Sequence, residues 1–177
     1  SNATLLVGSP LLVSLDGMDP NGDAITYSVT SSNPAVTAAV QTGNPSWRVT
    51  VDGFGEMIFQ LFEDKAPRPV DRIVELTNSG FYDGLTFHRV LNNFVIQGGD
   101  PNGNGTGGSQ LPNFDDQFNV DLQHNRTGLL SFAKSADDTN NSQFFVTEGA
   151  SRHLDFNHSI FGVLTEGEDV REAISNV

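Results

Sequence analysis

The sequence predicts a mainly β protein, either a β-barrel or a sandwich, with two helices. Three observations support this fold class. Short apolar runs alternate with glycine-rich loops after residue 80, two earlier runs form a hairpin pattern, and only two segments have helical spacing. With 177 residues, 37% of them hydrophobic, the chain is long enough to bury one core of ordinary size.

The composition excludes several classes of protein. Lys and Arg number 9 against 22 Asp and Glu, a net charge of −13. A nucleic-acid partner is therefore not expected, because phosphate binding needs a basic face. The lack of cysteine excludes disulfides, thiolate zinc sites and cysteine nucleophiles. No apolar run approaches the roughly 20 residues of a membrane-spanning helix, so no span is expected in this chain.

Residues 1–3 look like the remnant of a cleaved tag, and residues 4–45 predict a β-rich extension. Apolar and polar residues alternate over 11–15 and 25–29, as they do in half-buried strands. The stretch 19–28 resembles part of a bacterial cadherin-like or immunoglobulin-like repeat, although a whole sandwich takes about 100 residues. We therefore expect a partial β unit that packs on the following domain, in an extracytoplasmic bacterial protein.

Asp19, Asn21 and Asp23 are spaced like the start of a calcium-binding loop. An EF-hand would continue with Gly at the sixth position and Glu at the twelfth, where this chain has Ala24 and Thr30. The segment is therefore predicted to be a turn. A calcium-dependent adhesion role stays open as an alternative.

From residue 46 the pattern predicts one domain that runs to residue 177. Residues 47–51 and 57–62 predict a β-hairpin. A helix is predicted to begin at Pro67 and to end at 78–80, with a buried face made of Val70, Ile73, Val74 and Leu76. The remaining apolar runs each predict a strand, and they are 85–90, 94–97, 128–133, 143–147 and 159–164; a second helix is predicted over 167–175.

Motifs that often mark cofactor sites are rejected. Residues 103–108 contain the spacing G-x-G-x-x-G, but Pro112 and a polar run follow where a dinucleotide site needs a helix. The spacing of His153 and His158 matches no metal-binding signature. The serine-nucleophile motif G-x-S-x-G does not occur. No metal or other cofactor is expected.

Strand alternation separates two neighbouring phenylalanines. In the run 143–147, residues 143 and 145 share one face, and residues 144 and 146 share the other. Phe144 is therefore predicted in the core and Phe145 against a pocket. Taken singly, Arg89 is typical of a surface charge, and core positions stay open as an alternative for the phenylalanines.

Five motifs follow one another between residues 46 and 177. They are Phe87-His88-Arg89-Val90, FVIQGGD at 94–100, GTGG at 105–108, SQFF at 142–145, and Leu154-Asp155-x-x-His158-x-x-Phe161-Gly162. In this order the sequence resembles the cyclophilin family of peptidyl-prolyl cis/trans isomerases. The resemblance implies a closed antiparallel β-barrel capped by two α-helices. It also implies a proline-binding pocket and an enzyme that rotates Xaa-Pro bonds during protein folding.

The resemblance also implies the roles of single residues. The catalytic residues would be Arg89, Phe94, Gln97 and Phe145. The substrate-binding residues would be His88, Val95, Ala133, Lys134, Gln143, His153, Leu154 and His158. Proline-containing polypeptides would be the partners, with the ring held by phenyl groups and the chain paired with the backbone at 133–134.

The chain departs from the family pattern at two of these positions. Lys134 stands where Asn is common, and His153 stands where many eukaryotic members carry Trp. Cyclosporin-type cyclic peptides are therefore expected to bind with weakened affinity. A catalytically weak scaffold module, which docks proline segments within a larger surface protein, is the alternative function.

Overall fold

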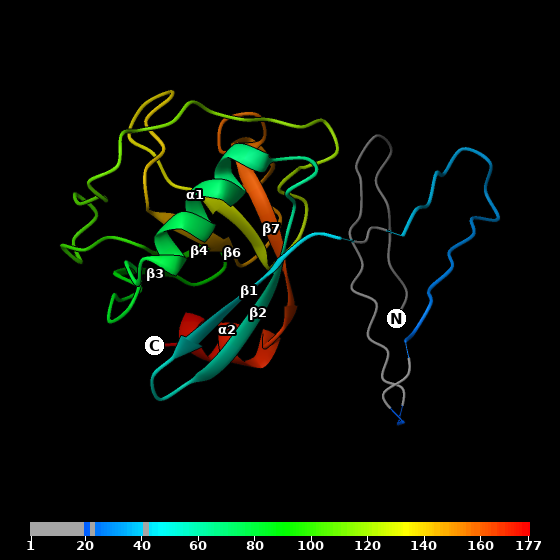
Figure 1. The fold of residues 1–177 in the computed structure, drawn as a ribbon, viewed down its shortest axis with the longest axis horizontal. Coiled ribbons are helices and arrows are strands. Elements are labelled where there is room, and N and C mark those ends of the chain that lie inside the picture. The colour runs from blue at the N-terminus through cyan, green and yellow to red at the C-terminus, as the bar shows by residue number, and fades with distance from the viewer. Residues whose placement is uncertain (1–19, 22–23, 41–42) are drawn as a thin grey trace.

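A computed structural model describes residues 20–21, 24–40 and 43–177. Seven strands and two α-helices lie between residues 46 and 177 (Figure 1). In chain order they are β1 (Ser46–Val51), β2 (Gly55–Leu61), α1 (Pro67–Asn78), β3 (Arg89–Leu91), β4 (Val95–Gly98), β5 (Leu129–Phe132), β6 (Phe144–Thr147), the short 3-10 turn η1 (Arg152–Leu154), β7 (Ile160–Glu166) and α2 (Glu168–Ser175). The predicted mainly β domain with two helices is confirmed.

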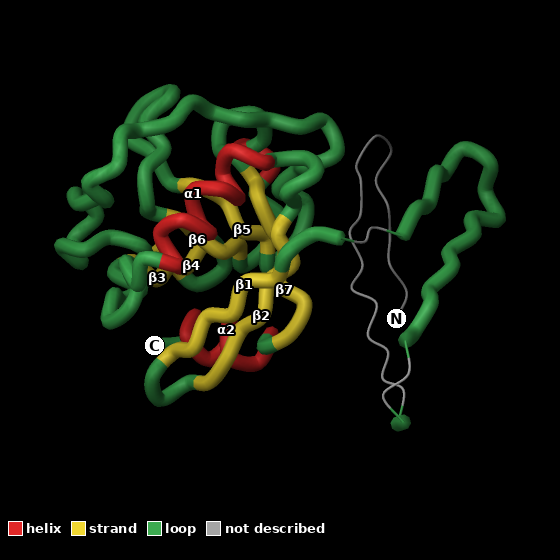
Figure 2. The backbone as a smooth tube through the Cα atoms, in the orientation of Figure 1, coloured by secondary structure: helices red, strands yellow, loops and turns green. Residues whose placement is uncertain are grey.

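The strands form one curled antiparallel sheet in the order β1-β2-β7-β5-β6-β4-β3 (Figure 2). Closure of the sheet into a barrel is not found among the described residues, because β1 and β3 are its two edges and do not pair. Helix α2 packs against β2 near one edge and against β3 at the other. A helix thus occupies the space between the two ends of the sheet.

The main core lies inside the curl of the sheet and is rich in phenyl rings. Phe59, Phe132 and Phe161 are fully buried there. Phe144 belongs to this core, as its strand parity predicts, and meets the Trp47 ring edge-on at 5.1 Å. Burial of such rings supplies most of the stability of the domain.

Helix α1 buries the face that its spacing predicts, with one exception. Val70, Ile73 and Leu76 lie in the core, whereas Val74 is 37% exposed. Val74 comes one residue after Ile73, so its side chain is rotated by about 100° from the buried stripe.

No helix in the described part of the chain combines the length and apolarity needed to cross a membrane.

The predicted strand at 25–29 is wrong. Residues 24–40 contain no helix or strand, and Ile25, Tyr27 and Val29 are all at least 36% exposed. A lone alternating segment without a partner leaves its backbone groups unpaired. The other predicted strand, 11–15, and the carboxylates of Asp19 and Asp23 lie outside the described residues.

A buried ion pair anchors α2 to the rest of the domain. The Arg171 guanidinium contacts the Glu148 carboxylate, and their side chains are 7% and 6% exposed. Arg171 also bonds Glu168 on its own helix, at 2.7 and 2.9 Å. The backbone N–H of Glu148 donates to the carbonyl of Phe94, so this pair also fixes the loop that carries Phe94.

Arg171→Met is expected to lower the free energy of unfolding by about 3–5 kcal/mol, because it leaves the Glu148 charge buried without a partner. The double variant with Glu148→Gln should recover at least half of the loss, and urea denaturation measures both. Arg48→Met, which breaks the exposed pair with Glu56, is the matched control and should cost less than about 1 kcal/mol. Equal losses in the two single variants would contradict the anchoring role.

Candidate active site

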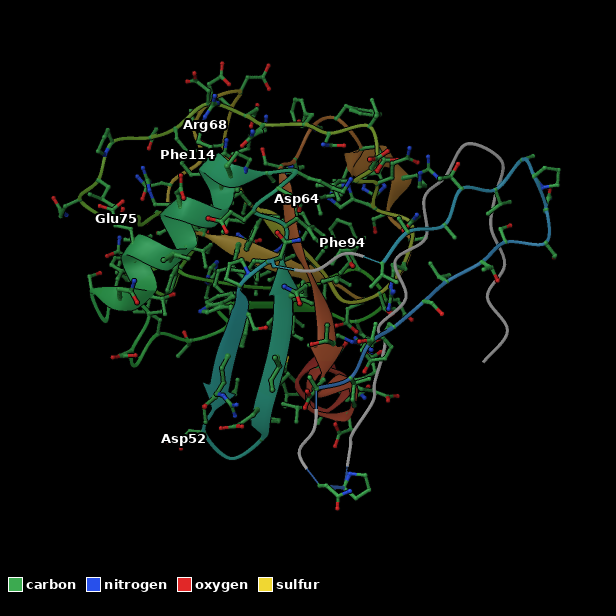
Figure 3. All side chains as sticks on the ribbon, turned by 45° about the vertical axis from the view of Figure 1, so that its right-hand side comes forward. Asp52, Asp64, Arg68, Glu75, Phe94 and Phe114 are labelled. Atoms are coloured by element: carbon green, nitrogen blue, oxygen red, sulfur yellow. The ribbon has the colours of Figure 1, made fainter. Side chains whose placement is uncertain are left out.

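A second apolar cluster lies apart from the main core. Val95, Phe145 and Leu154 are its buried members, and Phe94 and Ala133 pack against it while partly exposed. These residues come from β4, β6, η1 and the segment that follows β5. Phe94, labelled in Figure 3, precedes β4 directly. The cluster forms an apolar cup at the surface of the sheet.

The register of the sheet explains why the cup is separate from the core. On β6, Phe144 lies in the core and Phe145 lies in the cup, which confirms the predicted alternation. Gln97 on β4 is the direct cross-strand partner of Phe145, and Arg89 on β3 is the partner of Gln97. Directly opposed residues share a face of the sheet, so Arg89 and Gln97 stand beside the cup.

A chain of hydrogen bonds holds the polar side of the cup. Arg89 Nη1 donates to Gln97 Oε1 at 3.1 Å, and Gln97 Nε2 donates to Gln143 Oε1 at 3.0 Å. Gln143 Nε2 in turn donates to the carbonyls of Gly105 and Gly107 at 3.1 and 2.8 Å. The Arg89 guanidinium carbon lies 5.9 Å from the Phe94 ring centre. The side chain of Arg89 is thereby directed toward the apolar cup.

The glycine-rich loop at the end of this chain is built around one carboxylate. Asp100 accepts from the backbone N–H groups of Asn102, Asn104 and Gly105. Burial tends to raise the pKa of the Asp100 carboxyl, but these three donors outweigh it and hold that pKa below its usual range. The loop is therefore a structural support for Gln143.

Two histidines predicted as substrate-binding residues contact the cup. The exposed His153 ring stacks on Phe94, with centroids 5.7 Å apart. The His158 ring meets Phe145 edge-on at 5.4 Å, and its Nδ1 lies 2.9 Å from the carbonyl oxygen of Phe132. Burial lowers the pKa of His158, although the bond to Phe132 opposes the shift. A neutral imidazole with its proton on Nδ1 satisfies this geometry.

Two other predicted residues lie beside the cup rather than in it. The Lys134 ammonium bonds Asp116 and Asp137, and its side chain is only 4% exposed. Its backbone N–H has no acceptor among the described residues, so the main chain remains available for pairing. The His88 ring lies near Gly105, and neither of its nitrogens has a hydrogen-bond partner in the part of the chain that the structure describes.

A residue that was not predicted from the sequence, His124, lies beneath the cup. Its fully buried ring stacks on Phe145, with centroids 6.1 Å apart. Nδ1 lies 3.2 Å from Asp155 Oδ1, and Nε2 lies 3.2 Å from Ser131 Oγ. The His124 backbone N–H also donates to Asp155 at 2.6 Å, one residue beyond Leu154. Burial lowers the pKa of His124 to about 4, although Asp155 opposes the shift.

A separate hollow of about 340 Å³ lies between the end of α1 and the glycine-rich loop. Leu76, Phe81 and Leu111 are among its walls, and it shares no residue with the cup. The described residues contain no group of three or more carboxylate or imidazole side chains that could hold a metal ion.

An apolar cup bordered by the Arg89 guanidinium and by the strand end at Ala133 is the kind of site expected of a peptide-binding enzyme that acts on proline segments. Residues 46–177 match the family model described as cyclophilin type peptidyl-prolyl cis-trans isomerase/CLD. The chain belongs to this family. The match covers the same residues as the described domain and does not include residues 1–45, so it gives the predicted cadherin-like or immunoglobulin-like resemblance of that segment no support.

Similar proteins carry the same family name. The chain is 42% identical to peptidyl-prolyl cis-trans isomerase ppi1 of Schizosaccharomyces pombe over 118 residues, which are 66% of this chain and 76% of that protein. It is 38% identical to peptidyl-prolyl cis-trans isomerase-like 2 of Rhizopus delemar over 134 residues, or 75% of this chain, but spans only 25% of that longer protein. These relatives are eukaryotic, and they give the predicted bacterial, extracytoplasmic origin no support.

A solved structure shares the fold. A cyclophilin type peptidyl-prolyl cis-trans isomerase of Cryptosporidium parvum, crystallised in the presence of the dipeptide Ala-Pro, is 35% identical. The match has a TM-score of 0.68 and covers 70% of this chain and 81% of that one. The curled sheet with two helices is thus the fold of the family.

His124→Gln is expected to flatten the acid dependence of stability. An unfolded histidine has a pKa of about 6.5, whereas the pKa of folded His124 is about 4. As pH falls through this window the unfolded state binds the proton first, so the free energy of unfolding drops by about 3 kcal/mol in the native protein. Denaturant titrations between pH 7 and 4 measure the slope. His153→Gln, at an exposed ring, should keep the native slope, and a native slope in His124→Gln would refute the buried neutral state.

Proposed function

We propose that residues 46–177 catalyse cis/trans rotation about Xaa-Pro bonds in polypeptides, with Arg89, Phe94, Gln97 and Phe145 as catalytic residues. The observation that carries this proposal is the position of the Arg89 guanidinium, bonded to Gln97 at 3.1 Å and beside the Phe94 ring. A proline ring seated in the cup would place its amide nitrogen next to a permanent cation. The family membership of the chain supports the same activity.

The chemistry follows from the resonance of the peptide bond. Rotation has a barrier of about 18–20 kcal/mol, because the C–N bond has partial double-bond character. In the twisted state this resonance is lost, and the prolyl nitrogen regains a lone pair. Arg89 can donate a hydrogen bond to that lone pair only in the twisted state. The interaction therefore stabilises the transition state over both planar states.

The other residues would hold one side of the bond while the other turns. Phe94, Phe145 and Leu154 would enclose the proline ring, with Val95 as the wall between them. Gln97 and the main chain at Ala133 and Lys134 would bond the substrate backbone, with the N–H of Lys134 as the donor, because the N–H of Ala133 already donates to the carbonyl of Gln143. His158, held by the Phe132 carbonyl, would close the side of the cup next to Phe145. No proton transfer or covalent intermediate is needed.

Arg89→Ala is expected to lower kcat/KM by at least about 100-fold, as loss of one donor to a transition-state charge does, while peptide Kd changes only a few-fold. A protease-coupled assay with an Ala-Pro peptide measures turnover, and isothermal titration measures binding. Arg48→Ala, which removes an exposed arginine from β1, should match the native domain in both assays. An equal loss of binding would make Arg89 a docking residue and favour the scaffold alternative.

Binding of cyclosporin-type peptides is expected to be weak, because His153 forms the rim where it stacks on Phe94. His153→Trp should raise the affinity by at least about five-fold, since an added aromatic contact is worth about 1 kcal/mol. Turnover of a short peptide should change much less than the affinity, because the contact with the prolyl nitrogen belongs to Arg89. Titration calorimetry with cyclosporin tests this, and an unchanged affinity would remove His153 from the pocket.

A further inference from the structure

Two exposed phenylalanines form a pair beside the cup that the isomerase mechanism does not use. Phe118 is 43% exposed and Phe156 is 53% exposed. Their rings meet edge-on, with centroids 6.4 Å apart and an interplanar angle of 81°. Val120, in the same loop as Phe118, is 73% exposed. Single exposed apolar residues are ordinary. Two exposed aromatic rings in contact with each other form a continuous apolar patch that exists before any ligand binds.

The backbone under Phe156 is strained. Its φ is 54°, a left-handed value that a bulky residue adopts only at a cost. The turn is fixed from both sides, because the N–H groups of Asn157 and His158 both donate to the carbonyl of Leu154. The chain thus keeps a phenyl ring where glycine would be more stable. Such strain occurs where a side chain serves binding rather than folding.

The pair is continuous with the cup on two sides. Phe156 follows Leu154 by two residues, so their Cα atoms lie within about 7 Å of each other. On the other side, the Lys134 ammonium lies 6.0 Å from the Phe118 ring centre, and Lys134 follows Ala133 of the cup. Asp116 and Asp137 both bond that ammonium, whose side chain is only 4% exposed. Lys134 therefore presents no free cation next to the strand end at 133–134.

We propose that Phe118 and Phe156 form an aromatic subsite that binds an aliphatic or aromatic side chain of the substrate polypeptide. An extended peptide advances about 3.3 Å per residue, so the side chain would lie two or three residues from the proline. It would lie on the side of the proline that pairs with the main chain at 133–134. The proposal rests on the proposed function, because it takes the cup as the proline site, and it adds a preference for apolar flanking residues.

The subsite is tested by measuring the binding of peptides to the full chain, which contains the domain of residues 46–177. The probes are a peptide with one proline between three alanines on each side and four analogues, each with leucine two or three residues before or after the proline. Titration calorimetry gives Kd for each. At one of the positions, leucine should improve Kd by about three- to ten-fold, the range of one aromatic contact. Because binding is measured, absence of turnover would reject the isomerase activity and still leave the subsite tested.

Four variants and one matched control separate binding from folding. Phe118→Ala and Phe156→Ala should each reduce the leucine preference, and the double variant should reduce it little further, because each ring acts through the pair. Phe156→Gly should lose the preference as Phe156→Ala does, yet melt at a higher temperature, since glycine relieves the strained φ. Phe54→Ala, at a 40% exposed ring in the β1–β2 turn, is the matched control and should keep the preference.

Several results would overturn the proposal. One is a leucine preference that is absent from the native chain or unchanged in Phe156→Gly. Another is a melting temperature of Phe156→Gly below that of the native chain, with all five peptides weakened equally, which would make the pair structural. A third is loss of the preference in Phe54→Ala, which would place the apolar contact on another face.

Discussion

The site depends on the register of four strands. Arg89 pairs with Gln97, Gln97 pairs with Phe145, and Phe145 pairs with Ser131, so the four residues form one row across β3, β4, β6 and β5. A slip of one residue in any pairing would turn the side chains of that strand to the opposite face. Phe144 would then leave the core for the surface, and its burial against Trp47 opposes the slip. Core packing thus fixes the geometry of the cup.

Much of this row is visible in the sequence. Alternation in the run 143–147 separates Phe144 from Phe145, and a short apolar run locates the strand that carries Gln97. The strand that carries Arg89 is predicted at 85–90, whereas it spans only Arg89–Leu91. His124 gives no such signal, because it stands in a polar stretch and its partners Ser131 and Asp155 are 7 and 31 residues away. The strand at 25–29 fails for the opposite reason. Alternation of apolar and polar residues shows which face of a segment could be buried. It does not show whether another segment packs against that face.

Two hydrogen-bond networks behind the cup hold its side chains in place. The Gln97–Gln143 chain ends on carbonyls of the loop that Asp100 holds, and the ring of Phe145 rests on the imidazole that Asp155 and Ser131 hold. Both supports are local hydrogen-bond networks whose members come from distant parts of the chain. Their value lies in fixing side-chain rotamers before substrate arrives, since freezing a long side chain on binding costs up to about 1.5 kcal/mol. In the proposed mechanism the Arg89 guanidinium would then meet the prolyl nitrogen without that cost.

The partner of Arg89 decides how strongly it can act. Six other cations of the described chain contact carboxylates: Arg48, Lys65, Arg68, Lys134, Arg152 and Arg171. Arg89 instead bonds the neutral amide of Gln97, and no carboxylate lies within ion-pair distance of it among the described residues. A carboxylate partner would compete with the prolyl lone pair for the guanidinium donors and offset its charge. In a chain with a net charge of −13, a neutral partner would leave this cation free for the proposed hydrogen bond to the prolyl nitrogen.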